Sequence, residues 1–161
     1  TLFFRNRFDE ALPLYHKALE HAPDAYELWG NLADTYRQSS TGIEMAFPMY
    51  ANAIALAQKR LDINPLDAET LALMGHYHAC IGNREQALEL IHHALRLAPE
   101  NMYTAYNSAT ALVALGEINQ AIELLTQALA LGYPWHIMLA DANLQEIRNM
   151  PKFEALQPRQ E

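Results

Sequence analysis

The sequence repeats itself with a period of 34 residues, and this spacing constrains the fold more than any other feature. The clearest copies begin at Ala87 and Ala121, each followed by a large apolar residue four positions on and a second alanine seven positions on. The matching positions are Ala87, Ile91, Ala94 and Pro99, then Ala121, Leu125, Ala128 and Tyr133, with Ala11, Tyr15, Ala18 and Pro23 in an earlier unit. Self-similarity at this period is the signature of stacked supersecondary units.

A second pattern precedes each copy and indicates a helix of its own. It places Trp29, Leu32, Ala33 and Tyr36 over Leu71, Met74, Gly75 and His78, and over Ala105, Ser108, Ala109 and Leu112. Apolar residues recur at helical spacing and strand-like alternation is missing. Small residues let paired helices approach closely while larger neighbours fill the space between pairs. Each unit is therefore predicted to be a pair of helices.

The spacing W-x-x-L-A-x-x-Y at residues 29–36, followed by the alanine pattern and a closing proline, resembles the tetratricopeptide repeat. This resemblance implies an all-α fold, a right-handed α-solenoid of helix-turn-helix repeats with a short C-terminal helical cap. Within one solenoid over 1–161, we expect a truncated repeat at 1–24 that lacks its first helix. Complete repeats should follow at 25–67, 68–101 and 102–134, with the cap at 135–161.

Helix boundaries are predicted from capping residues and turn formers. Capping boxes are expected at Asp24 with Glu27, Thr41 with Glu44, and Asn83 with Gln86. Pro23, Pro65 and Pro99 should lie just past helix ends, and Gly82 and Gly116 in the turns inside units.

The second unit is longer than the others. Its closing Pro65 arrives seven residues later than the period predicts. Seven residues are nearly two helical turns, so the second helix can lengthen with little drift of its buried face. We expect a helix over roughly residues 42–64, about 35 Å long. Pro48 should kink it, as Pro13 should kink the equivalent helix. The extension is interpreted either as a docking surface or as a spacer.

Composition excludes several classes of partner. The chain carries 11 Lys and Arg against 19 Asp and Glu, a net charge of −8. Phosphate backbones and anionic membranes are bound by basic residues, so contact with nucleic acid or a membrane is not expected. No stretch approaches the length of a membrane span.

Candidate catalytic and metal-binding residues do not form a recognisable site. His76 and Cys80 are one helical turn apart, but two ligands fall short of the four of a structural zinc site. His78 takes the aromatic position of its repeat, which predicts an interior histidine. The serines and histidines show no catalytic order. We therefore predict a non-catalytic protein with no metal and no cofactor.

A partner is expected on the concave face that the first helices of successive units line in this architecture. The predicted partner-binding residues are Asn31, Asp34, Arg37, Leu73, His76, Tyr103, Tyr106, Asn107 and Thr110. Asparagines can hydrogen-bond the backbone of an extended peptide, and tyrosines are frequent interface anchors. Relatives in the wider repeat family that grip a C-terminal carboxylate use groove lysines, which are missing here. A basic or apolar protein or peptide is the expected partner.

Two longer segments carry a narrower resemblance. WGNLADTYRQ with AIALAQKRLDINPLDAETLALMGHYHACIG, and ALALGYP with DANLQEIRNMPKFEAL, are similar to the tetratricopeptide region after the kinase domain of some bacterial serine/threonine protein kinases. Related tails follow adenylate-cyclase domains and winged-helix transcription regulators. The resemblance implies an interaction module of a larger bacterial signalling protein, cytoplasmic unless a preceding membrane span places it outside the cytoplasm. The alternative is self-association into a homodimer through Leu2, Phe3 and Phe4.

Overall fold

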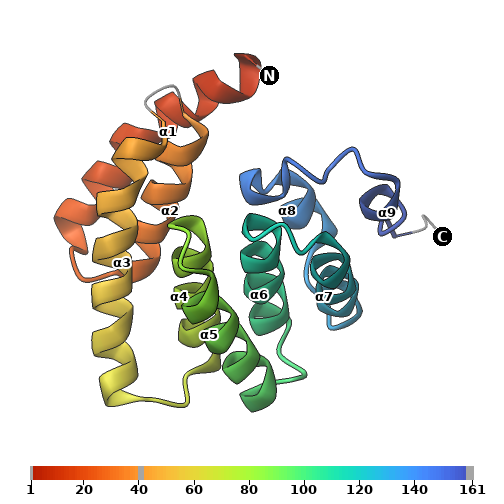
Figure 1. Cartoon of the computed structure of the whole chain (residues 1–161). Helices are drawn as coiled ribbons and strands as arrows, with labels where there is room; N and C mark the ends of the chain where they lie inside the picture. Colours follow the sequence, from red (N-terminus) through yellow and green to blue (C-terminus); the bar gives the residue numbers. More distant parts are fainter. Residues whose placement is uncertain (1, 40–41, 159–161) are drawn as a thin grey trace. The chain divides into compact units, whose positions relative to one another are not determined.

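The structure, a computed structural model, describes residues 2–39 and 42–158 (Figure 1). Every regular element in these two ranges is a helix, which confirms the predicted all-α helical repeat fold. The chain divides into two compact units, residues 1–65 and residues 66–161, and each unit has its own packing.

Unit 1 holds three helices, α1 (Leu2–His21), α2 (Tyr26–Gln38) and α3 (Ile43–Ile63). Helix α2 packs against both α1 and α3. Helix α3 has 21 residues, against 14 in α5 and 13 in α7, so the long helix predicted for roughly 42–64 is confirmed. Pro13 and Pro48 both lie inside continuous helices. The kinks expected at these prolines stay a prediction.

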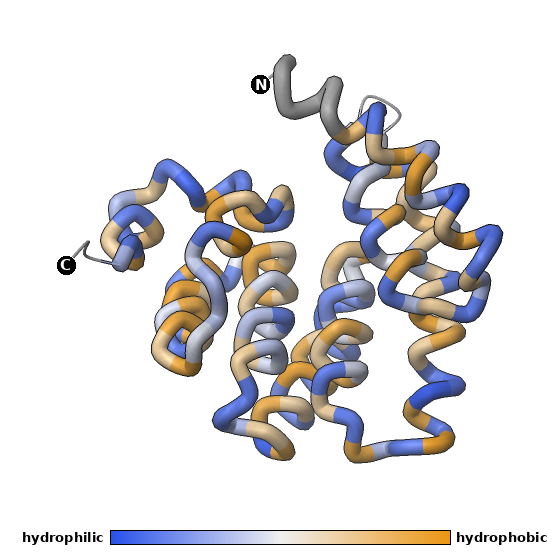
Figure 2. The backbone as a smooth tube through the Cα atoms, turned by 180° about the vertical axis from the view of Figure 1, so that it is seen from behind, coloured by the Kyte–Doolittle hydropathy of each residue, from blue (hydrophilic) through white to orange (hydrophobic). Residues whose placement is uncertain are grey.

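Unit 2 contains two long helix pairs and a C-terminal segment. The pairs are α4 (Ala68–Cys80) with α5 (Arg84–Leu97), and α6 (Met102–Ala114) with α7 (Ile118–Ala130). The segment consists of α8 (Trp135–Ala140), the 3-10 turn η1 (Ala142–Leu144) and α9 (Pro151–Glu154). Helix α6 packs on α4, α5, α7 and η1. Hydrophilic and hydrophobic residues are interspersed along these helices (Figure 2), as expected for helices that bury one face.

The repeated alanine pattern marks the helix face that is buried within each complete pair. Three sets of positions have no exposed surface: Ala46, Tyr50 and Ala53 on α3, Ala87, Ile91 and Ala94 on α5, and Ala121, Leu125 and Ala128 on α7. We call these the signature positions. Their complete burial shows that the 34-residue period reports close packing between the two helices of a pair.

Helices α4 and α5 pack so closely at Gly75 that a methyl group on this residue would overlap α5. A Cβ atom on Gly75 of α4 would lie 2.6 Å from Ile91 Cγ2 on α5. At the equivalent repeat positions α6 and α7 carry Ala109 and Leu125, both buried in one core cluster. Leucine has no branch at Cβ, whereas isoleucine places Cγ2 there. Isoleucine, which is branched at Cβ, is therefore paired with glycine, and leucine, which has no branch at Cβ, is paired with alanine.

Two of the three predicted capping boxes are not formed. Helix α2 begins after Ala25 and has no side-chain cap, so the box at Asp24 is wrong. Asn83 is the N-cap residue of α5, yet its side chain makes no capping bond and lies 3.2 Å from His78 Nδ1 instead. The box at Thr41 falls outside the described residues. Side-chain caps are made by Asp67 at α4 and by Asn101 at α6. Gly82 and Gly116 lie in the turns inside units, as predicted, and both have positive φ.

Candidate functional site

The exposed part of the predicted binding surface in unit 2 lies on α4 and α6. Tyr103 and Asn107 are one turn apart on α6 and therefore share a helix face. The Tyr103 side chain is 47% exposed and Asn107 is partly exposed. Leu73, at the equivalent repeat position to Asn107, is partly exposed on the neighbouring α4. These three residues are accessible to a partner.

Tyr103 is held by an aromatic stack. The ring of Tyr133, in the turn after α7, lies 6.1 Å from the Tyr103 ring at an interplanar angle of 78°. On its other side Tyr133 stacks on Tyr106, with centroids 3.9 Å apart and planes 12° from parallel. Edge-to-face and stacked contacts stabilise aromatic pairs beyond the area that they bury. The exposed ring is thus positioned by two rings beneath it.

The base of the stack is fixed by a buried hydrogen bond. The Tyr106 hydroxyl donates to Asp141 Oδ2 at 2.5 Å, and Asp141 Oδ1 accepts the backbone N–H of Asn143 at 2.8 Å. Burial, together with the Asp141 carboxylate, raises the pKa of Tyr106 far above its ordinary value. Burial, followed by the same carboxylate, raises the pKa of Tyr133 to about 12. Both phenols therefore stay protonated at neutral pH.

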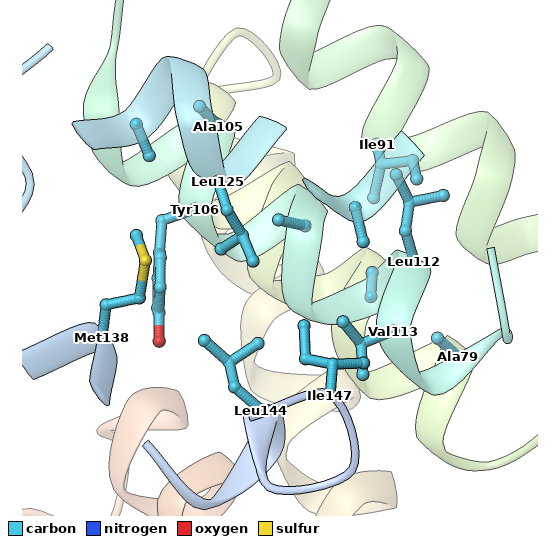
Figure 3. Close-up of a cluster of buried hydrophobic side chains, with 14 of the residues drawn as sticks. Ala79, Ile91, Ala105, Tyr106, Leu112, Val113, Leu125, Met138, Leu144 and Ile147 are labelled. Atoms are coloured by element: carbon cyan, nitrogen blue, oxygen red, sulfur yellow. The ribbon is translucent and has the colours of Figure 1, made fainter. Parts of the chain in front are cut away.

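The C-terminal segment covers the part of α6 around Tyr106, which was predicted to line an open groove. Figure 3 shows Met138 beside the Tyr106 ring and Ile147 beside Val113. Met138, Leu144 and Ile147 have no exposed surface, and Phe153 packs on Trp135 with ring centroids 5.5 Å apart.

Three predicted groove residues on helices of unit 2 are buried, and the first is His76 on α4, which is 2% exposed. The side chain of Tyr106 is 4% exposed, as is that of Thr110, whose hydroxyl donates to the Asn107 carbonyl at 2.8 Å. The placement of all three on an open groove is corrected because their side chains are buried. Tyr106 is covered by Asp141 and Met138 of the C-terminal segment (Figure 3). Covering by this non-repeat segment could not be foreseen from the period.

The predicted site residues of unit 1 all lie on α2. Asn31 is exposed, and Asp34 and Arg37 follow at intervals of three residues with partial exposure. The Asp34 carboxylate accepts a hydrogen bond of 2.5 Å from the Tyr50 hydroxyl of α3. This bond ties α2 to α3, so Asp34 has a structural role that sequence spacing did not reveal.

His76 and Cys80 contact each other on α4, as their spacing predicts. Cys80 Sγ lies 3.6 Å from His76 Nε2, and the His76 ring meets the Tyr77 ring edge-on. The neighbouring His78 is half-buried, and burial lowers its pKa. Within unit 2, His76 and Cys80 form a packed pair, and two ligands fall short of the four that a structural zinc site uses.

Sequence reasoning missed two residues of the candidate site, Tyr133 and Asp141. Tyr133 stands where the other repeats carry a closing proline, and this departure was the available signal. Asp141 had no signal, because it follows the end of the periodic pattern.

A surface hollow of about 480 Å³ lies beside the lengthened end of α3 in unit 1. Its lining residues are Asp24, Tyr26, Glu27, Leu56, Lys59, Arg60 and Ile63. The lining combines two acidic residues, Asp24 before α2 and Glu27 in its first turn, with the basic Lys59 and Arg60 of α3 and with apolar side chains. Because the lining carries both charges, it favours neither an acidic nor a basic ligand. The long helix is therefore still interpreted either as a docking surface or as a spacer.

Comparison with known proteins identifies the family. Two family models described as tetratricopeptide repeat match residues 1–68 and residues 81–144. Together they span well over half of the sequence, and the chain belongs to the tetratricopeptide repeat family. Such repeats generally mediate protein–protein interaction and are typically non-catalytic.

Two solved structures match 80% of this chain at low sequence identity. One, titled "Crystal structure of MamA", is 22% identical with a TM-score of 0.44, over 80% of this chain and 71% of that chain. The other, titled "Crystal structure of MamA protein", is 18% identical with a TM-score of 0.39, over 80% and 84% respectively. No curated protein sequence matches. In the described ranges, none of the helices combines the length and apolar character needed to cross a bilayer.

Proposed function

We propose that this chain is a protein–protein interaction module that binds an extended segment of a partner protein at the exposed face of α4 and α6. The observation that carries this proposal is Tyr103, which is 47% exposed and yet is held by the Tyr133 ring beneath it. A positioned aromatic ring loses little conformational entropy on binding, which is the property of an interface anchor.

The neighbouring residues define the chemistry of the partner. The Asn107 side-chain amide has no hydrogen bond within the described ranges, so it can pair with the backbone of an extended peptide. Leu73 and the Tyr103 ring favour an apolar or aromatic side chain. The net charge of −8 favours basic residues in the flanking positions.

The sequence resemblance supports a role within a larger protein. The segments that resemble the region after bacterial kinase domains favour a role in recruiting substrates or regulators to a larger signalling protein in the cytoplasm. A scaffolding or self-associating region of a cyclase or a transcription regulator is the alternative. Sedimentation analysis of the chain over a range of concentrations separates the alternatives, because only self-association gives a mass that rises with concentration.

The binding surface is tested with peptides selected from a random phage-displayed library against the 161-residue chain. Calorimetry then compares the selected peptide on the unmodified chain, on Tyr103→Ala and on the control Glu89→Ala, whose residue is exposed on α5. Loss of an anchor of about 2 kcal/mol should weaken binding by more than tenfold, with no change in the control. Equal affinity for Tyr103→Ala and the unmodified chain would place the binding site elsewhere.

Tyr106 must stay intact in this experiment. Replacing it together with Tyr103 would remove the hydrogen bond to Asp141 and disturb the core of unit 2. Loss of binding by such a double variant would not distinguish a contact from a packing defect.

A further inference from the structure

A hollow of about 340 Å³ lies between α5 and α7 in unit 2, and we call it the α5–α7 hollow. Its apolar lining comes from Ile91 and Leu95 of α5, Leu112 of α6 and Leu124 of α7. Ile91 and Leu112 are almost fully buried and lie next to each other at its floor (Figure 3). Sites for small ligands begin at about 300 Å³, so the hollow is large enough to receive a side chain of a partner. None of its lining residues belongs to the exposed face of α4 and α6.

The equivalent place in unit 1 is filled by a tyrosine of the chain itself. Tyr36 of α2 stands at the repeat position of Leu112, and His16 of α1 stands at that of His92. The Tyr36 hydroxyl lies 2.8 Å from His16 Nε2 and shares a hydrogen bond with it. The two rings also meet edge-on, with centroids 6.0 Å apart. Unit 1 therefore shows how a phenol fits between the second helices of two successive repeats.

Unit 2 keeps the histidine but not the phenol. Leu112 has neither an aromatic ring nor a hydroxyl, so it cannot pair with His92, which is exposed at the rim of the hollow. Leu95 is partly exposed, whereas Leu19, at the same repeat position on α1, is 7% exposed. The greater exposure of Leu95 agrees with the smaller side chain at position 112. The α5–α7 hollow thus has the apolar walls and the hydrogen-bonding ring that hold a phenol in unit 1.

The rim defines the charge of a ligand. Of the described residues that line the hollow, Glu123 on α7 is acidic and exposed, and none is a lysine or an arginine. A carboxylate in such a rim favours a cationic group on the ligand. Gln127 donates a hydrogen bond of 2.6 Å to the Pro99 carbonyl, which ties α7 to the turn after α5 beside the hollow.

We propose that the α5–α7 hollow binds the side chain of a tyrosine in a partner polypeptide, next to a lysine or arginine that pairs with Glu123. The ring packs on Leu112, and its hydroxyl bonds to the His92 ring as that of Tyr36 bonds to His16. Burial of an aromatic ring with a satisfied hydroxyl is the arrangement that tyrosine adopts at interfaces. This site is separate from the α4–α6 face, so a partner can use either one alone.

The test uses acetyl-tyrosyl-arginine amide as the probe, titrated into the 15N-labelled 161-residue chain and followed by amide chemical shifts. We expect saturable shifts at the residues that line the hollow. Replacing the tyrosine of the probe by phenylalanine, or its arginine by glutamine, should each weaken binding about threefold or more. On His92→Phe the tyrosyl and phenylalanyl probes should bind equally, and on Glu123→Gln the arginine and glutamine probes should bind equally. Glu146→Gln removes an exposed carboxylate outside the hollow and should leave every affinity unchanged.

A second pair of variants fills the hollow from within. Leu112→Tyr places a phenol of the chain itself beside His92, as Tyr36 is placed in unit 1, and should abolish binding of the probe. The matched control Leu112→Met introduces no ring and should still bind it. Because Leu112 is buried, thermal unfolding first checks that both variants fold, whereas His92 and Glu123 are exposed and their variants carry little such risk.

Three outcomes would overturn the proposal. The first is the absence of saturable shifts around the hollow, including shifts that are confined to α4 and α6. The second is equal binding of the tyrosyl and phenylalanyl probes by the unmodified chain. The third is undiminished binding by folded Leu112→Tyr, which would show that the probe does not occupy the place of the missing phenol.

Discussion

Helix α1 in unit 1 and helix α6 in unit 2 each present a face toward which the repeat pattern would place another helix, but only α6 has that face covered. On α6 the cover is the C-terminal segment, whose residues Met138, Leu144 and Ile147 have no exposed surface. On α1 the corresponding side leaves Leu14 69% exposed. The difference shows that the repeat defines which face requires a cover, while the cover need not be another full repeat.

The largest expected effect tests how firmly the C-terminal segment is packed. Phe153→Ala should lower the free energy of unfolding of unit 2 by about 3–5 kcal/mol, because a fully buried ring leaves a cavity. Trp135, which packs on Phe153, reports unfolding by fluorescence in a Trp29→Phe background during a urea titration. Met150→Ala, at a residue 38% exposed, is the control and should change stability little. A similar small effect from Phe153→Ala would mean that the segment is only loosely attached.

A smaller effect is expected where two helices touch most closely. Gly75→Ala should cost about 2–3 kcal/mol, because the new methyl group would overlap Ile91 Cγ2. Adding Ile91→Leu recreates the combination of Ala109 and Leu125 found in the next pair, and should recover most of the loss. A double-mutant cycle measured by urea denaturation gives this coupling energy. Strict additivity of the two changes would show that the residue at position 91 does not determine whether a methyl group is tolerated at position 75.

The hydrogen bond that anchors the aromatic stack should contribute less. Tyr106→Phe leaves the Asp141 carboxylate without its phenol donor and should cost about 1.5 kcal/mol. Because the folded pKa of Tyr106 is raised above the ordinary value of 10.0, the bond contributes fully below pH 10 and is lost as the pH rises further. The unfolding free energy of the unmodified chain should therefore fall more steeply above pH 10 than that of Tyr106→Phe. Parallel pH profiles would show that Tyr106 ionises as easily in the folded chain as in the unfolded one.

These tests also mark what the sequence could and could not predict. Positions such as Ala87 and Ala121 were predictable because close helix pairing imposes the same steric requirement in every repeat. Tyr106 was misplaced because its burial depends on Asp141 and Met138, which lie beyond the last period. The periodicity also gave no information on contacts that occur once in the chain.

Local polar contacts were harder to predict than apolar packing. The box proposed at Asp24 fails because α2 begins after Ala25, and a motif of two polar residues does not define where a helix starts. Asp34 was predicted to bind a partner because its side chain is polar and stands at a groove position of the repeat. In the structure its carboxylate accepts a hydrogen bond from the Tyr50 hydroxyl. A hydrogen bond such as that between Asp34 and Tyr50 cannot be predicted from positions that recur in each repeat.

The smallest expected effect is that of Leu14→Ala on α1, measured against Leu90→Ala on α5. Leu14→Ala and Leu90→Ala change the same residue type at the same repeat position, on α1 and α5. Leu90 is 7% exposed, so its replacement should cost about 2–5 kcal/mol, whereas Leu14 is 69% exposed and its replacement should cost less than about 0.5 kcal/mol.

Urea titrations of the 161-residue chain measure both values, with Trp29 reporting on unit 1 and Trp135 on unit 2. A cost for Leu14→Ala as large as that for Leu90→Ala would mean that the α1 leucine is buried in solution, and the difference between α1 and α5 would disappear.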